Sequence, residues 1–131
     1  MFGKANKIAS SEDQTFSYIP DCSDLPISED ADYVYICENN TIYGTKFKTL
    51  PNTKGKTLVA DVSSCFLSEP VDVTKYGVIY GGVQKNIGPA GVVLTNFASN
   101  SSLPVTNGTF IRERSSFLTV PLKSLLSSRK S

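Results

Sequence analysis

Histidine is absent from the 131-residue sequence, and cysteine occurs only three times, at Cys22, Cys37 and Cys65. A structural zinc site needs four nitrogen or sulfur ligands, and these widely spaced cysteines form no Cys-x-x-Cys pair, so the sequence predicts no metal site. Reduced thiols of a cytoplasmic protein explain the cysteines better. The absence of histidine also removes the commonest general base. Any chemistry must therefore use lysine, aspartate, glutamate, tyrosine, cysteine or a cofactor.

Long apolar runs and a strong net charge are also lacking. No run approaches the roughly 18 apolar residues of a membrane helix, and residues 1–7 (MFGKANK) lack the apolar centre of a signal peptide. The net charge of +1 gives no global attraction to nucleic acid or to an anionic membrane. A hydrophobic content of 40% over the length of one ordinary domain is typical of a soluble globular protein. We therefore expect a cytoplasmic protein with no nucleic-acid or membrane partner.

Charge and serine are unevenly distributed along the chain. Residues 1–93 carry 8 basic and 11 acidic side chains, whereas residues 94–131 carry 5 basic side chains, 1 acidic side chain and 9 serines. The second segment has only scattered apolar residues, so burial offers little to offset the entropy lost on ordering it. The sequence therefore predicts a domain over residues 1–94 and a divergent, Ser-rich, basic and poorly ordered tail over residues 95–131.

Short apolar runs separated by loops predict β-strands. Runs of four to six apolar residues, without strict alternation, indicate strands buried on both faces, as in an α/β sheet. The linkers are long enough for the crossovers of parallel strands, yet only residues 68–75 are predicted to form one or two helical turns. We therefore expect a partial sheet that has lost covering helices, as in a fragment of a larger domain. The predicted strands are residues 6–10, 33–37, 57–62, 76–80 and 91–95.

One lysine stands in an unusual loop. In residues 75–92 (KYGVIYGGVQKNIGPAGV), an apolar run delivers Lys85 into a stretch rich in glycine, proline and asparagine. Such loops hold reactive groups more often than they build a core. The glycines match neither the G-x-G-x-x-G pattern nor a phosphate-binding P-loop, so they indicate tight turns rather than nucleotide binding. Without its context, Lys85 would be interpreted as a solvated surface charge.

A carboxylate ends the preceding apolar run. Asp61 closes the run over residues 57–62, where a charge is costly unless a partner binds it. The alternative is an aspartate that caps a turn. The 24-residue step from Asp61 to Lys85 leaves room for a crossover and a second strand. The two side chains are therefore expected at neighbouring strand ends, near the carboxyl edge of the sheet.

These segments together resemble the phosphoserine aminotransferase family of class-V aminotransferases, which use pyridoxal phosphate (PLP). The resemblance is carried by residues 38–44 (ENNTIYG), 58–64 (LVADVSS) and 77–91 (GVIYGGVQKNIGPAG), and it covers about residues 3–94. It implies a partial mixed α/β sheet from the large domain of a fold-type-I PLP-dependent transferase. It also implies that Lys85 binds the cofactor covalently and moves protons at the substrate α-carbon, and that Asp61 holds the pyridine nitrogen. Thr41 and Gln84 would contact the cofactor ring.

The resemblance further implies an activity and an assembly. The family transfers an amino group between glutamate and 3-phosphohydroxypyruvate in serine and pyridoxine biosynthesis, and it forms homodimers. The family's phosphate-binding turn, its stacking aromatic ring and its substrate-binding arginine have no counterpart in this sequence, and neither do its second domain and phosphate-binding Asn-Thr pair. We therefore expect the isolated chain to be inactive. The alternative to a working enzyme is a truncated, inactive remnant or isoform that pairs with full-length subunits.

Overall fold

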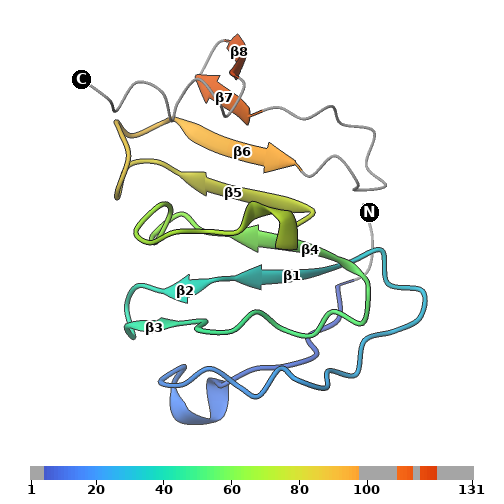
Figure 1. The fold of residues 1–131 in the computed structure, drawn as a ribbon. Coiled ribbons are helices and arrows are strands. Elements are labelled where there is room, and N and C mark those ends of the chain that lie inside the picture. Colours follow the sequence, from blue (N-terminus) through green and yellow to red (C-terminus); the bar gives the residue numbers. More distant parts are fainter. Residues whose placement is uncertain (1–4, 98–108, 114–115, 121–131) are drawn as a thin grey trace.

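A mixed β-sheet forms the centre of the computed structural model, which describes residues 5–97 and the backbone of residues 109–113 and 116–120 (Figure 1). Six strands lie in the order β1-β4-β5-β6-β7-β8. Their bounds are Tyr33–Cys37 for β1, Thr57–Asp61 for β4, Val78–Gly82 for β5, Val93–Phe97 for β6, Thr109–Glu113 for β7 and Ser116–Val120 for β8. Strands β1, β4 and β5 run parallel, and the other three continue the sheet in antiparallel pairs. The predicted mixed sheet is therefore confirmed.

The remaining regular elements are short. Strands β2 (Asn39–Asn40) and β3 (Thr45–Lys46) form a separate antiparallel pair directly after β1. Helical structure in the described residues is limited to two 3-10 turns, η1 (Glu12–Gln14) and η2 (Val73–Lys75). The helical turns predicted over residues 68–75 thus shrink to η2. The Asp72 side chain begins this turn by accepting the N–H of Thr74 at 3.1 Å, and such local bonding competes with a longer helix.

One of the five predicted strands is wrong. Residues 5–10 have no regular structure and are mostly exposed. A strand depends on a neighbour that takes up its backbone hydrogen bonds, and the described part of the chain provides none there. The other four predictions are confirmed as β1, β4, β5 and β6, although β5 and β6 lie two residues further along the chain than predicted.

The parallel strands bury one face of the sheet and leave much of the other open. In β1, Val34 and Ile36 are buried, whereas Tyr33 and Tyr35 are 56% and 52% exposed. The expectation of burial on both faces is therefore wrong for β1, whereas in β5 the neighbouring residues Val78 and Ile79 point to opposite faces and both are buried. The better-covered face is the one that carries Val34, Ile36 and Ile79. The core on that face comprises Val34, Ile36, Leu58, Ala60, Val62, Cys65, Phe66, Tyr76, Ile79, Val83 and Leu94.

The parallel register brings three strand ends to one edge of the sheet. Cys37 at the end of β1 pairs with Asp61 at the end of β4, and Asp61 pairs with Tyr80 of β5. All three strands point toward the same side of the molecule, on the left of Figure 1. The loops that follow them therefore meet at this carboxyl edge, as the sequence predicts for the loops of Asp61 and Lys85.

Only part of the segment predicted to be a poorly ordered tail is described by the structure. Strands β6, β7 and β8 lie between residues 93 and 120. All other residues after position 97 lie outside the described residues. The division at residue 94 and the poor order of the tail therefore stay predictions. Within the described ranges, no helix is long and apolar enough to cross a membrane, and no cluster of three or more His, Cys, Asp or Glu side chains could hold a metal ion.

Candidate active site

Three loops at the carboxyl edge carry the four residues that the sequence singles out. Thr41 lies in the turn between β2 and β3, Asp61 ends β4, and Gln84 and Lys85 follow β5. The side-chain oxygen Oδ1 of Asn40 shapes the first turn by accepting the N–H groups of two following residues at 3.1 and 3.3 Å. Asn side chains that bond the backbone ahead of them favour such turns.

Asp61 is half-buried and held by its own following turn. Its Oδ1 accepts two hydrogen bonds from Ser63, one from the backbone N–H at 2.9 Å and one from the hydroxyl at 2.6 Å. Its backbone carbonyl accepts the N–H of Glu38 at 2.9 Å, which ties the end of β4 to the end of β1. Asp61 therefore has the local bonds of a turn aspartate, the alternative considered for it, while its other carboxylate oxygen is not taken by Ser63.

The Thr41 loop is joined to the same turn. The Thr41 hydroxyl donates to the Ser64 hydroxyl at 2.6 Å, although the two residues are 23 positions apart in the sequence. Ser64 is adjacent to Ser63, so the paired serines contact both the Thr41 loop and Asp61. The Thr41 loop is therefore linked, through Ser64, to the turn that follows Asp61.

The Lys85 loop is held by hydrogen bonds of the residues on either side of the lysine, and not by the lysine side chain. The buried Val83 carbonyl accepts the N–H groups of Ile87 and Gly88 at 2.9 and 3.0 Å, and the Asn86 amide donates to the Phe66 carbonyl at 3.1 Å. Gln84 and Lys85 are exposed. Among the described residues, none forms a hydrogen bond or an ion pair with the Lys85 ammonium group. The loop backbone is therefore fixed while the amine stays available to a ligand.

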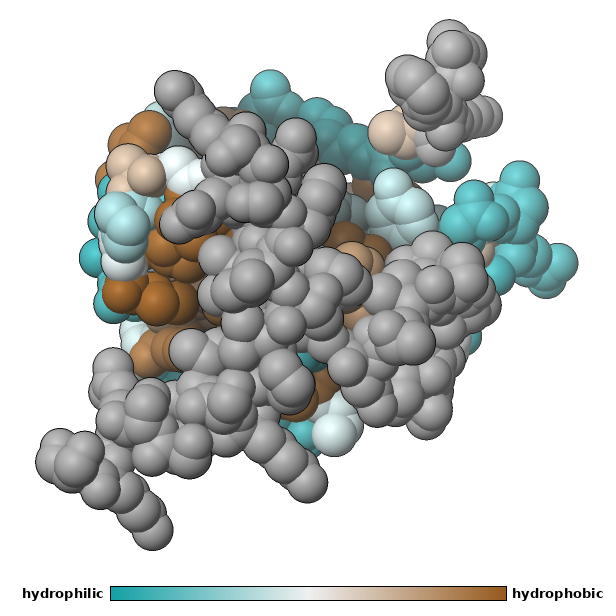
Figure 2. All heavy atoms as spheres, turned by 90° about the horizontal axis from the view of Figure 1, so that it is seen from above, coloured by the Kyte–Doolittle hydropathy of each residue, from teal (hydrophilic) through white to brown (hydrophobic). Residues whose placement is uncertain are grey.

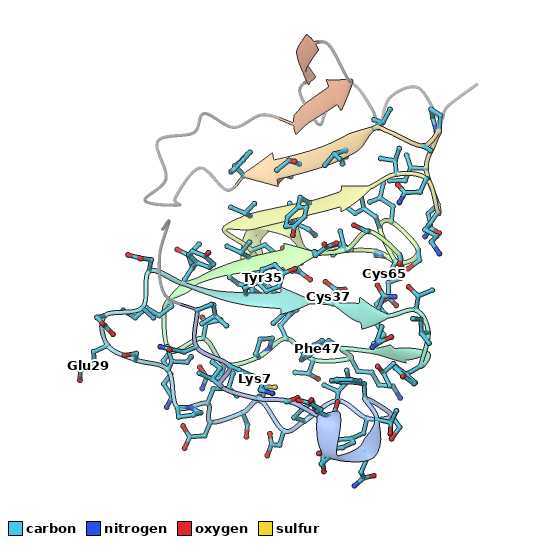
Figure 3. All side chains as sticks on the ribbon, turned by 180° about the vertical axis from the view of Figure 1, so that it is seen from behind. Lys7, Glu29, Tyr35, Cys37, Phe47 and Cys65 are labelled. Carbon is cyan, nitrogen blue, oxygen red and sulfur yellow. The ribbon has the colours of Figure 1, made fainter. Side chains whose placement is uncertain are left out.

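Polar side chains on the open face of the sheet lie beside Asp61. Tyr35 of β1 and Tyr80 of β5 have hydroxyl oxygens 3.4 Å apart, and Cys37 projects from β1 on the same face as Tyr35 (Figure 3). Burial, the Tyr35 hydroxyl and the Asp61 charge raise the pKa of Tyr80, and burial together with the Asp61 charge raises the pKa of Cys37. A second negative charge beside Asp61 is thus disfavoured, and Tyr80 and Cys37 stay protonated near neutral pH.

A buried carboxylate beneath this edge escaped the sequence analysis. Glu38 is only 6% exposed, and its Oε2 accepts the Tyr76 hydroxyl at 2.9 Å. Burial and the Glu38 charge raise the pKa of the neighbouring Cys65 to about 11, so this thiol is unreactive at neutral pH. Lys46 and Glu69 form an ion pair nearby. The available sequence signal was a glutamate directly after the apolar run over residues 33–37, in the same position relative to its strand as Asp61.

Close backbone packing between β5 and the Ser63 turn leads to a first prediction. A Cβ atom on Gly81 would lie 3.0 Å from the N and Cα atoms of Ser63 and 3.1 Å from the carbonyl carbon of Val62. We expect Gly81→Ala to lower the free energy of unfolding by about 1–3 kcal/mol, since the backbones would have to separate. Urea unfolding monitored by circular dichroism measures this change. The matched control is Gly82→Ala, whose three nearest Cβ contacts would all be atoms of the movable Gln84 side chain. Equal losses for the two variants would contradict the prediction.

Comparison with known proteins places this arrangement in context. Residues 6–124 match the family model described as aminotransferase class-V. The phosphoserine aminotransferase of Desulfosudis oleivorans is 53% identical over 89 residues, which are 68% of this chain and 24% of that protein. The chain thus spans about a quarter of the length of such curated relatives.

Solved structures agree in fold. The phosphoserine aminotransferase from Bacillus circulans subsp. alkalophilus superposes with a TM-score of 0.67 at 36% identity, over 71% of this chain and 26% of that one. The PLP-bound phosphoserine aminotransferase from Trichomonas vaginalis gives a TM-score of 0.51 at 42% identity, over 54% of this chain and 20% of that one. The matched part of the chain therefore has the fold of these proteins.

Proposed function

Because the chain belongs to the class-V aminotransferase family, we propose that it forms part of the active site of a phosphoserine aminotransferase. The proposed reaction transfers an amino group between glutamate and 3-phosphohydroxypyruvate, in serine and pyridoxine biosynthesis, with PLP as cofactor. One observation carries the proposal: Asp61 and the Lys85 loop follow neighbouring parallel strands at one edge of the sheet. Ligands of open α/β sheets bind at this carboxyl edge.

The side chains present suit a pyridine aldehyde. Lys85 offers an amine with no competing partner among the described residues, and Asp61 offers a carboxylate held in a defined orientation. When bound, PLP supplies an electron sink for charge that develops at the substrate α-carbon. Asp61 would keep a proton on the ring nitrogen, and Lys85 would attach the cofactor and then move the proton at the α-carbon. Thr41 and Gln84 would contact the ring from the two flanking loops.

A second subunit is the proposed partner at this edge. Three large apolar side chains on the three carboxyl-edge loops are exposed: Ile42 by 86%, Leu67 by 63% and Ile87 by 42%. Figure 2, seen from above, shows hydrophobic residues at the left, the side toward which β1, β4 and β5 run. Contiguous exposed apolar patches, unlike single exposed side chains, mark interaction surfaces. We assign these three side chains to the contact surface of the family's homodimer. The proposed dimer works in the cytoplasm. Its proposed substrates are glutamate and 3-phosphohydroxypyruvate.

A chimeric enzyme tests the proposed function. The matching segment of the Desulfosudis oleivorans phosphoserine aminotransferase, 89 residues that are 53% identical, is replaced by its counterpart from this chain. We expect the purified chimera to transaminate phosphoserine with 2-oxoglutarate within about tenfold of its parent, equal to about 1.4 kcal/mol of activation free energy. A folded, PLP-saturated chimera without turnover would contradict the proposal.

A further inference from the structure

We propose that Ser63 is a positioning residue that orients the Asp61 carboxylate and couples it to the strand leading into the Lys85 loop. The inference rests on the proposed function, in which Asp61 and Lys85 serve one bound cofactor.

The hydrogen bonds of the Ser63 hydroxyl have a fixed direction. A serine hydroxyl has one proton to donate and lone pairs that accept. The N–H of Gly82 donates to Ser63 Oγ at 3.1 Å, and Ser63 Oγ donates to Asp61 Oδ1 at 2.6 Å. The Asp61 carboxylate can only accept a hydrogen bond and the Gly82 N–H can only donate one. The Ser63 hydroxyl proton must therefore point to Asp61. Hydrogen bonds in such a series strengthen one another.

For Asp61 the consequence is a fixed carboxylate plane. Both donors to Oδ1 come from Ser63, from its backbone at 2.9 Å and from its hydroxyl at 2.6 Å. Rotation of the carboxylate would break both bonds together. Oδ1 is thereby held in place by Ser63. A group that must contact one ring atom gains from being oriented before the ligand binds.

For the Lys85 loop the consequence is a defined starting point. The last backbone bond between β4 and β5 runs from the N–H of Val62 to the carbonyl of Tyr80 at 2.8 Å. In a continuing ladder the Gly82 N–H would donate to a backbone carbonyl, whereas here it donates to the Ser63 side chain. Gly82 lies three residues before Lys85. The strand that leads to the lysine is therefore held by the same hydroxyl that holds Asp61.

Amide hydrogen exchange of the full chain, followed by NMR without any cofactor, tests this coupling. In Ser63→Ala we expect the Gly82 amide to exchange about tenfold faster, the effect of losing one hydrogen bond of ordinary strength. Ser63→Thr keeps the hydroxyl and should restore the protection. The control is the Val62 amide, whose bond to the Tyr80 carbonyl does not involve Ser63. Equal acceleration at Gly82 and Val62 would show a general loss of stability and overturn the proposal.

A second variant separates positioning from packing. Asp61→Asn keeps the shape of the side chain but weakens the acceptor, so it should also speed exchange at Gly82, two hydrogen bonds away. Adding Ser63→Ala to Asp61→Asn should then give no more acceleration than Ser63→Ala alone, because the two residues act in one series. Additive effects would overturn the proposal. If Ser63→Ala unfolds the chain, the exchange rate of the Gly82 amide in Asp61→Asn alone tests the proposal. An unchanged rate would then overturn it.

The exchange experiment and the chimera experiment can fail separately. If Gly82 responds as expected and the chimera is inactive, the aminotransferase proposal fails and the role of Ser63 in fixing Asp61 stands. If the chimera is active and Ser63→Ala leaves the exchange rate of the Gly82 amide unchanged, the proposed role of Ser63 fails and the aminotransferase proposal stands.

Discussion

Lys85→Ala is expected to reduce turnover by the chimeric enzyme at least about a thousandfold, or roughly 4 kcal/mol of activation free energy. The reason is that one amine is assigned two tasks, attaching the cofactor and moving the proton at the substrate α-carbon. Steady-state rates with phosphoserine and 2-oxoglutarate measure the loss. The matched control is Lys75→Ala, which removes an exposed lysine ten positions earlier, at the end of η2. Retention of more than a tenth of the activity by Lys85→Ala would contradict the assignment.

The isolated 131-residue chain is expected to show no transamination above the background of free PLP, even with excess cofactor. It spans about a quarter of the length of its relatives, and the segments that the resemblance assigns to the cofactor phosphate and the substrate carboxylate have no counterpart in it. Lys85 could still react with PLP, but the ring would not be held against Asp61. Loss of that alignment costs several kcal/mol of activation free energy.

The comparison with Lys85→Ala makes this second prediction decisive. In the isolated chain, Lys85→Ala should change the total PLP adduct only slightly, because other lysines also react. Turnover that Lys85→Ala abolishes would show that the chain is a working enzyme by itself. Inactivity of both the isolated chain and the chimera would instead favour the alternative, an inactive remnant or isoform.

Much of the sheet could be predicted because its strands are marked by local sequence. The apolar runs that became β1 and β4 are bounded by polar turns, and the second of them ends on Asp61, the carboxylate that the sequence singled out. The spacing from Asp61 to Lys85 was sufficient to predict a crossover to a neighbouring parallel strand. The positions of Thr41, Asp61 and Lys85 at one edge follow from that register.

The failures have a common physical cause, since each depends on long-range contacts. Residues 6–10 have a strand-like composition, but strand formation needs a partner that composition does not reveal. Apolar Tyr35 suggested burial on both faces, yet whether a face is covered depends on what packs there. The bond from Gly82 to Ser63 joins residues 19 positions apart. The sequence around Ser63 does not predict this hydrogen bond. Its only local signal is a serine two positions after an aspartate, which is typical of a turn.

The most direct test of the account is to find which lysine carries the cofactor. The PLP-saturated chimera is treated with borohydride, which makes a covalent lysine–cofactor linkage permanent, and the modified peptides are identified by mass spectrometry. The account predicts that one modified peptide dominates and that its modified residue is Lys85, with the signal lost in Lys85→Ala. Modification of another lysine, or an even spread over several, would contradict the assignment of Lys85 as the cofactor-binding lysine.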